Sequence, residues 1–314
     1  MSPLFDPRAF ALMQLARSFY EGNPQLLAID QGYRYDQDGP TEDVVIRVHF
    51  LGLGPGDVQK PPGGEELELM FFGTEGQVHR KYQEPWCRPQ RRLMPGLSIG
   101  FKNPCSLGLI GVDKKDNNRP ALLTCRHLFG PNPKPNAKVF QPAPRHQRGQ
   151  SRQQILRTAI GRLNRISTSV DAAVVHLNGR RRASNRLFTG SQQRRLEITR
   201  LRSAKLGEIL VKSGCRTGVT KARVDGVGLL FTGVDQEPQR VFRLVPVPTT
   251  TGSNREISAP GDSGAIWMDP EGSAGVGLHI RGELDPKKSN EYAFALDLEL
   301  VCDEIGFELM QNVT

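Results

Sequence analysis

One short turn of the sequence has the residue types that nucleophilic catalysis requires. Ser263 lies in the segment 258–266, where glycines on both sides of Asp262 and Ser263 permit a tight turn. Such a turn exposes the serine hydroxyl and directs the amides of Gly261 and Ser263 to one side, which predicts a nucleophile above an oxyanion hole. The Gly-Asp-Ser-Gly pattern also occurs in ordinary turns, so this interpretation requires a base and an orienting acid elsewhere.

A candidate base and a candidate acid precede this turn. In the segment 122–128 an apolar, strand-like run ends at His127, and Asp171 begins the apolar run 171–175. A carboxylate at the mouth of so apolar a strand favours a paired group over an accidental charge. The separations between His127, Asp171 and Ser263 are long enough to place them on different elements. We expect them to meet as a base, an orienting acid and a nucleophile.

This order and spacing resemble those of the trypsin-like serine proteases with the chymotrypsin fold, over roughly residues 96–314. The resemblance implies a mainly β fold with a double antiparallel β-barrel. It also implies a triad of His127, Asp171 and Ser263, with the Gly261 and Ser263 amides as the oxyanion hole. The expected activity is hydrolysis of peptide bonds in proteins through an acyl-enzyme, without a metal or organic cofactor.

The domain organisation follows from hydrophobic patterns. Residues 1–88 are expected to form a small α/β domain, with a helix over 8–20 and strands at 26–29, 44–50 and 67–72. Proline and arginine mark 89–95 as a linker, and the double barrel is expected over 96–314. Its parts are a first barrel at about 97–178, a basic connector at about 179–205, and a second barrel with a C-terminal helix (298–309) at about 206–314.

The amino-terminal pattern, together with residues 95–100 and 212–220, resembles the intracellular Narrow Leaf-type trypsin-like peptidases of plants and their bacterial relatives. In secreted trypsin-like proteases, cleavage frees an apolar amino terminus, which then pairs with the acid before the nucleophile. The sequence has no Ile-Val-Gly-Gly start, so we expect Asp262 to have another partner.

Charge is distributed unevenly along the chain. The chain has 42 Lys and Arg against 33 Asp and Glu, but residues 145–223 hold 19 basic residues and only three acids. This stretch is either a solvated connector or a docking surface for a polyanion such as nucleic acid, acidic lipid or an acidic protein. The alternative to an enzyme is therefore a pseudoprotease, or a module that binds a polyanion or a protein through this stretch. The sequence is also compatible with a homo-oligomer.

Substrate preference is predicted from residues around the nucleophile. In the chymotrypsin fold, the segment about six residues before the serine and the strand about sixteen after it line the substrate side-chain pocket. These positions hold Ser258, His279 and Arg281, and the strand resembles that of glutamyl endopeptidases and viral picornain-type proteases. The resemblance implies cleavage after Glu or Gln, with Ser258 and His279 as donors and Arg281 adding positive potential. The alternative is that His279 is purely structural.

Cysteine content and hydropathy bear on location. The five cysteines are odd in number and follow no paired spacing, which favours free thiols in a reducing compartment. No apolar run approaches the roughly 20 residues of a membrane span, and the first residues lack a basic segment followed by an apolar one. We expect a cytoplasmic protein without a membrane span. No His and Cys spacing predicts a metal site.

Overall fold

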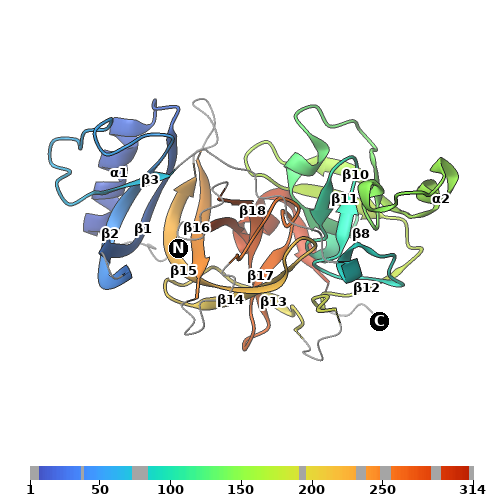
Figure 1. The fold of residues 1–314 in the computed structure, drawn as a ribbon. Coiled ribbons are helices and arrows are strands. Elements are labelled where there is room, and N and C mark those ends of the chain that lie inside the picture. The colour runs from blue at the N-terminus through green and yellow to red at the C-terminus, as the bar shows by residue number, and fades with distance from the viewer. Residues whose placement is uncertain are drawn as a thin grey trace.

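The computed structural model describes residues 7–36, 39–72, 84–190, 196–230, 238–247, 256–283 and 291–310. It is mainly β, and its parts lie side by side (Figure 1). The amino-terminal unit and the first barrel occupy the two ends, and the second barrel lies between them.

The amino-terminal unit is a helix packed on a sheet, as predicted. It contains α1 (Pro7–Tyr20), β1 (Leu26–Asp36), β2 (Gly39–Leu51) and β3 (Glu68–Phe72). The buried side chains of α1 recur every three or four residues, so one face of the helix packs on the strands. They are Ala9, Met13, Ala16 and Tyr20. β1 pairs antiparallel with β2, and β3 pairs parallel with β2.

This unit continues the sheet of the second barrel. β1 pairs antiparallel with β15 (Gly218–Leu230), in register from Ala28 and Leu230 to Gly32 and Gly226. The amino-terminal residues are therefore joined to the second barrel, although the first barrel follows them in sequence.

The first barrel is a curled eight-stranded sheet in the order β20-β7-β8-β11-β10-β9-β5-β6. A hairpin joins β7 to β8. The elements of this region are β5 (Ser98–Gly100), β6 (Pro104–Ser106), β7 (Ile110–Asp113), β8 (Arg119–Thr124), η2 (Arg126–Phe129), β9 (Lys138–Phe140), η3 (Pro144–His146), α2 (Arg152–Arg157), β10 (Ala159–Ile166) and β11 (Ala173–Leu177).

The second barrel closes on itself, because β14 pairs with both β17 and β15. Its strands are β14 (Ile209–Gly214), β15, β16 (Gln239–Pro246), β17 (Ile266–Asp269), β18 (Ala274–Gly282) and β19 (Ala293–Asp297). Short elements connect the barrels: η1 (Glu84–Cys87) precedes β4 (Arg92–Leu93), which pairs with β12 (Arg182–Ala183), while β13 (Arg200–Leu201) pairs with β18.

The C-terminal helix is shorter than predicted. α3 (Leu298–Ile305) is capped by the Asp297 carboxylate, which accepts a hydrogen bond from the Leu300 amide. It ends at Gly306, whose φ of 65° is the left-handed conformation that glycine adopts readily. The chain then forms β20 (Phe307–Leu309), which pairs with β7. The described C-terminal residues thus return to the first barrel and tie the two barrels together.

Candidate active site

The structure brings His127 and Asp171 together. His127 lies in η2 directly after β8, and Asp171 lies just before β11; these two strands pair antiparallel, which places the two segments side by side. His127 Nδ1 is 2.6 Å from Asp171 Oδ2, and the His127 amide donates to Asp171 Oδ1 at 3.0 Å. One carboxylate thereby holds both the ring and the backbone of His127.

This contact favours the protonated form of the imidazole. Burial by itself would lower the pKa of His127, but the hydrogen bond and negative charge of Asp171 raise it above its ordinary value. Asp171 is itself held by the second barrel, because its amide donates to Gln239 Oε1 at 3.0 Å. His127, Asp171 and Gln239 line a cleft of about 350 Å³, together with Arg126, Gly130, Pro131 and Thr168.

The candidate nucleophile turn is fixed on β6. The Ser106 amide donates to the Ser263 carbonyl at 2.8 Å, and Ser106 Oγ donates to the Gly261 carbonyl at 3.1 Å. Gly261 and Gly264 have φ values of 117° and 89°, so the turn needs glycine at both positions. A Cβ on Gly264 would also lie 2.4 Å from the Ser106 carbonyl oxygen. Within the described residues, the amides of Gly261 and Ser263 donate no hydrogen bond.

The Ser263 hydroxyl is not hydrogen-bonded to His127 within the described structure. Ser263 Oγ donates to the Ile280 carbonyl at 3.4 Å, while His127 Nε2 is 3.6 Å from Cys125 Sγ. Cys125 Sγ in turn lies 3.1 Å from Cys105 Sγ, which donates to the Ser263 carbonyl at 2.5 Å. A chain of contacts through two buried thiols therefore connects the candidate base to the backbone of the candidate nucleophile.

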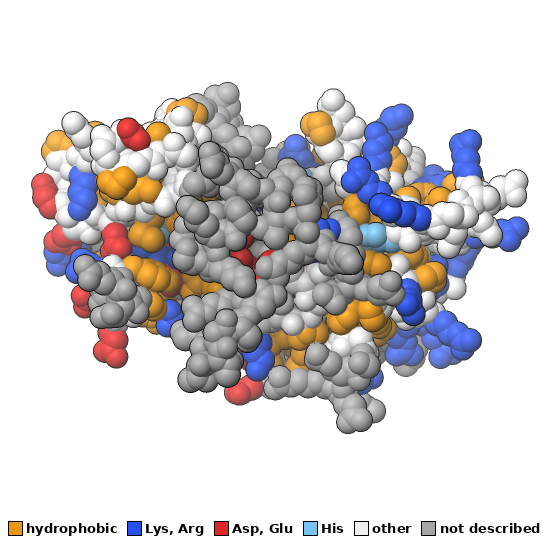
Figure 2. All heavy atoms as spheres, in the orientation of Figure 1, with side chains coloured by type: hydrophobic (Ala, Val, Ile, Leu, Met, Phe, Trp, Pro, Cys, Tyr) orange, Lys and Arg blue, Asp and Glu red, His pale blue; other side chains and the backbone are white. Residues whose placement is uncertain are grey.

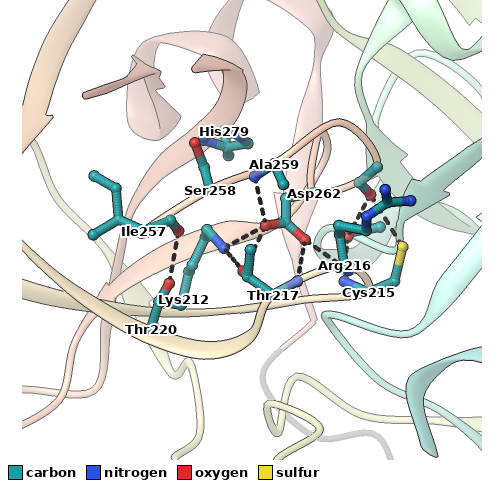
Figure 3. A network of polar contacts seen from close by, with 12 residues as sticks. Lys212, Cys215, Arg216, Thr217, Thr220, Ile257, Ser258, Ala259, Asp262 and His279 are labelled. Atoms are coloured by element: carbon teal, nitrogen blue, oxygen red, sulfur yellow. Dashed lines mark hydrogen bonds and ion pairs between the residues drawn. The ribbon is translucent and has the colours of Figure 1, made fainter. Parts of the chain in front are cut away.

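Asp262 has the internal partner that the sequence required. Lys212 Nζ is 2.9 Å from Asp262 Oδ2, and both side chains are fully buried (Figure 3). The Thr217 hydroxyl donates to the same oxygen at 2.6 Å, and the Arg216 amide donates to Oδ1 at 2.8 Å. Burial would raise the pKa of Asp262, but Lys212 holds it below its ordinary value. We did not single out Lys212 from the sequence, although a lysine inside the apolar strand β14 was a usable signal.

The predicted pocket residues Ser258 and His279 are both buried. Ser258 Oγ has no hydrogen-bond partner in the described structure, and it points away from the Asp262 carboxylate (Figure 3). His279 Nδ1 accepts from Trp267 Nε1 at 3.4 Å, which leaves the ring hydrogen on Nε2. Burial, followed by the charge of Lys212, lowers the pKa of His279 to about 3, so the ring is neutral.

Two further residues, Gly282 and Glu291, contact the backbone or side chain of Ser258 and hold its position. A Cβ on Gly282 would lie 2.3 Å from Ser258 Oγ, so the glycine leaves room for the hydroxyl. Glu291 Oε1 accepts from the amides of Ile257 and Ser258 at 2.8 and 3.2 Å, which fixes the backbone there. Sequence reasoning missed Glu291.

Arg281 lies on the other face of β18 from His279. The register with β19 shifts between them: His279 faces Ala295, and Arg281 faces Phe294. Because Ala295 and Phe294 are adjacent in a strand, their side chains point to opposite faces. Arg281 is close enough to Tyr292 for its charge to oppose the rise in the pKa of that phenol that burial causes.

The described ranges bear on two other classes of site, a metal centre and a membrane-spanning helix. No group of three His, Cys, Asp or Glu side chains is placed to hold a metal ion there. Among the described helices, none has the length and apolar character needed to cross a bilayer.

Comparison with known proteins gives structural matches only. No protein-family model matches the sequence, and no curated protein matches it. A solved glutamic acid specific serine protease, described as using a histidine triad in substrate binding, has a TM-score of 0.52 and 18% identity, and covers 69% of this chain and 100% of its own. The Nocardiopsis protease matches with a TM-score of 0.49 and 15% identity, and the match covers 69% of this chain and 98% of that protein. Protease A of Thermobifida fusca matches with a TM-score of 0.49 and 14% identity, and the match covers 70% of this chain and 100% of that protein. The chain has the chymotrypsin-like double β-barrel fold.

Proposed function

We propose that the protein is a serine endopeptidase in which Ser263 is the nucleophile, His127 the base and Asp171 the acid that orients it. The observation that carries this proposal is that two hydrogen bonds link His127 to Asp171, and that both residues line a cleft. The turn at Gly261 and Ser263 supports it with two amides that donate to no described group, as an oxyanion hole requires.

The reaction follows from these roles. His127 Nε2 takes the Ser263 hydroxyl proton as Oγ attacks the peptide carbonyl, while Asp171 stabilises the imidazolium that forms. The Gly261 and Ser263 amides donate to the developing oxyanion. His127 then protonates the leaving amine, and water hydrolyses the acyl-enzyme by the same route in reverse.

Attack requires the Ser263 side chain to turn from Ile280 toward His127. Its present contact of 3.4 Å is long for an O–H···O hydrogen bond, whose usual range is about 2.5–3.0 Å, so little is lost when it breaks. A serine side chain rotates between staggered positions around one bond. Catalytic hydrogen bonds are often long in unliganded structures and tighten when substrate binds.

A fluorophosphonate probe tests this proposal directly, because it labels only an activated serine. Wild-type protein is expected to be labelled, and Ser263→Ala and His127→Ala are not. Ser203→Ala, a serine outside the site, is the matched control and keeps full labelling. Absence of labelling in the folded wild type would reject the endopeptidase.

We further propose that the enzyme prefers Glu or Gln before the cleaved bond. Ser258 Oγ is buried without a partner, and the neutral His279 carries its hydrogen on Nε2, so both can donate to a side-chain oxygen of the substrate. Arg281 contributes only long-range positive potential in this proposal. A glutamic acid specific protease is among the proteins of similar fold.

A peptide library scanned at the residue before the cut tests this preference. Enrichment of Glu and Gln is expected in the wild type and is lost in His279→Phe, which keeps an aromatic ring but no donor. Enrichment of basic or aromatic residues would reject the assignment of Ser258 and His279 as donors.

We also propose that the protein is a cytoplasmic, Narrow Leaf-type peptidase, as the sequence resemblance implies. Its five free cysteines suit a reducing compartment. The amino-terminal α/β unit joined to the second barrel is the feature to compare with that group.

A second candidate function is binding of a polyanion on the first barrel, alone in a pseudoprotease or beside catalysis. Lys and Arg side chains gather at that end of the molecule (Figure 2). A groove of about 410 Å³ is lined there by Arg119, Lys138, Arg162 and Arg180, with Asp116 as the one acid in the lining. Lys138 and Arg162 are paired directly across β9 and β10. Like charges opposed in this way destabilise a sheet unless an anion compensates them.

Binding to a labelled nucleic acid duplex at several salt concentrations tests this second function. Affinity should fall steeply with salt, and Arg162→Gln should weaken it at least several-fold. Lys221→Gln, an exposed charge change on the second barrel, is the control. Equal effects of the two substitutions would show that the groove is not the site. Arg194 and Arg195, which the sequence included in the basic region, lie outside the described residues.

A further inference from the structure

Cys87 differs from the other four cysteines in its exposure. It is partly exposed in η1, which lies in sequence between the amino-terminal unit and the first barrel. The other four, Cys105, Cys125, Cys215 and Cys302, are buried. Reagents in solution therefore reach this thiol most easily.

Two other groups contact the Cys87 sulfur. Cys87 Sγ is 3.7 Å from the Cys215 carbonyl oxygen and 4.0 Å from His146 Nε2. His146 is held in place by a 2.8 Å contact between its Nδ1 and Ser98 Oγ. The Cys87 sulfur thus lies against the backbone of a second cysteine and beside an imidazole.

These neighbours favour the thiolate form of Cys87. The hydrogen bond from Cys215 lowers the pKa of Cys87 to about 6 against the opposing effect of burial, and His146 and the charge of Arg216 lower it further. The thiolate is the nucleophilic form of cysteine. Burial instead raises the pKa of Cys215, which keeps its proton.

Cys215 connects this pair to the candidate nucleophile turn. It directly follows β14, and its Sγ donates to the Gly261 carbonyl at 3.1 Å (Figure 3). Its amide donates to Ser106 Oγ at 2.9 Å, and that hydroxyl also donates to the Gly261 carbonyl. Cys215 therefore contacts the Cys87 sulfur through its carbonyl and the backbone next to Asp262 through its thiol.

We propose that Cys87 and Cys215 are a modification site, in which Cys87 reacts with a hydroperoxide and Cys215 then forms a disulfide with it. The Cys87 thiolate attacks the terminal peroxide oxygen; an S–O bond forms, the O–O bond breaks, and an alcohol or water leaves. Cys215 then attacks the resulting sulfenic acid; the S–S bond forms and water leaves with the proton of Cys215. The two thiols lose two electrons, and the peroxide gains them.

The disulfide changes the nucleophile turn, and this consequence rests on the proposed function. Once oxidised, Cys215 has no S–H to donate to the Gly261 carbonyl, and its sulfur is drawn toward Cys87. The Gly261 carbonyl loses one of its two described donors and keeps Ser106 Oγ. We expect oxidation to lower the rate of fluorophosphonate labelling of Ser263 about tenfold, which is less than the roughly 10²–10³-fold loss when an oxyanion-hole donor is removed outright.

Mass spectrometry of the full chain after treatment with hydrogen peroxide tests the site without any need for activity. A peptide linked through Cys87 and Cys215 is expected in the wild type. Cys87→Ser should abolish it, and Cys302→Ser, the matched control in a buried helix, should keep it. A disulfide between Cys105 and Cys125 in its place, or oxidation of Cys87 no faster than that of Cys302, would overturn the proposal.

Two further measurements test the proposal even if a cysteine variant fails to fold. Alkylation of Cys87 by iodoacetamide should rise with pH around a midpoint near 6, and a midpoint at the ordinary thiol value of about 8.5 would contradict the reactive-thiol assignment. Labelling of Ser263 should fall on oxidation in the wild type but not in Cys87→Ser. Unchanged labelling despite a confirmed disulfide would overturn the link to the turn. No labelling of the reduced protein would reject the proposed function but leave the thiol site standing.

Discussion

Lys212 Nζ lies 2.9 Å from Asp262 Oδ2, with no exposed surface on either side chain, directly behind the turn that carries Ser263. The pair joins β14 to the nucleophile turn inside the second barrel. Because both charges belong to the folded chain, the turn needs no new chain end to hold Asp262.

Removal of the Lys212 charge should disrupt the turn and the fold. Lys212→Met keeps the length of the side chain but leaves the Asp262 carboxylate buried and unpaired, which costs about 3–5 kcal/mol in the free energy of unfolding. Urea unfolding measures this loss, and fluorophosphonate labelling should disappear. The control Lys221→Met, on the surface of β15, should leave both unchanged. Normal labelling of Lys212→Met would contradict the role of the pair.

The pH dependence of catalysis should report the His127–Asp171 bond. The base must be neutral to accept a proton, and the pKa of His127 is raised by Asp171. The kcat/KM value should therefore fall as the pH drops through a midpoint above the ordinary histidine value of about 6.5. In Asp171→Asn the midpoint should move down, and kcat should fall about 10⁴-fold. An unchanged midpoint in that variant would show that Asp171 does not set the charge of His127.

A methyl group at Gly282 should damage recognition of Glu and Gln. It would lie 2.3 Å from Ser258 Oγ and would force the hydroxyl aside. Loss of one hydrogen bond to the substrate side chain should lower kcat/KM for Gln peptides about tenfold relative to Ala peptides. Gly56→Ala, where a Cβ meets nothing within 4 Å, is the matched control. A uniform loss for all peptides would indicate a folding defect instead.

The amino-terminal unit should unfold together with the second barrel. Arg47 is completely buried; its Nε bonds Asp30 at 2.8 Å within the unit, and its Nη1 bonds Asp225 of β15 at 2.8 Å. Arg47→Met leaves two buried carboxylates without this partner, at a cost of about 3–5 kcal/mol. The exposed Arg34→Met is the control, with an expected loss below about 1 kcal/mol.

Tryptophan fluorescence during urea unfolding makes this test specific. Trp267 lies on β17, and Trp86 Nε1 donates to Ser213 on β14, so both report on the second barrel. A midpoint shifted by Arg47→Met would show that the two units unfold as one. An unshifted tryptophan signal beside a shifted far-UV signal would show that α1 and β1–β3 unfold independently.

Local sequence patterns were enough to predict the strands next to the candidate base and acid. The apolar runs before His127 and after Asp171 predicted β8 and β11, because such runs report directly which residues are buried. The predicted C-terminal helix was too long, because Phe307 and Leu309 continue its apolar pattern although the helix ends at Gly306. The sequence did not predict β9 and η3, because their few residues give no readable period.

The sequence by itself determined the residue types, the order of His127, Asp171 and Ser263, and the need for glycine around the nucleophile, because these depend on side-chain chemistry and local backbone sterics. Tertiary structure alone decided which groups meet. It joined the amino-terminal unit to the second barrel, gave Asp262 its partner in Lys212, and placed Cys87 beside Cys215. A hydrophobic period reveals that a face is buried but not what covers it, so contacts between distant strands emerge only when the barrels close.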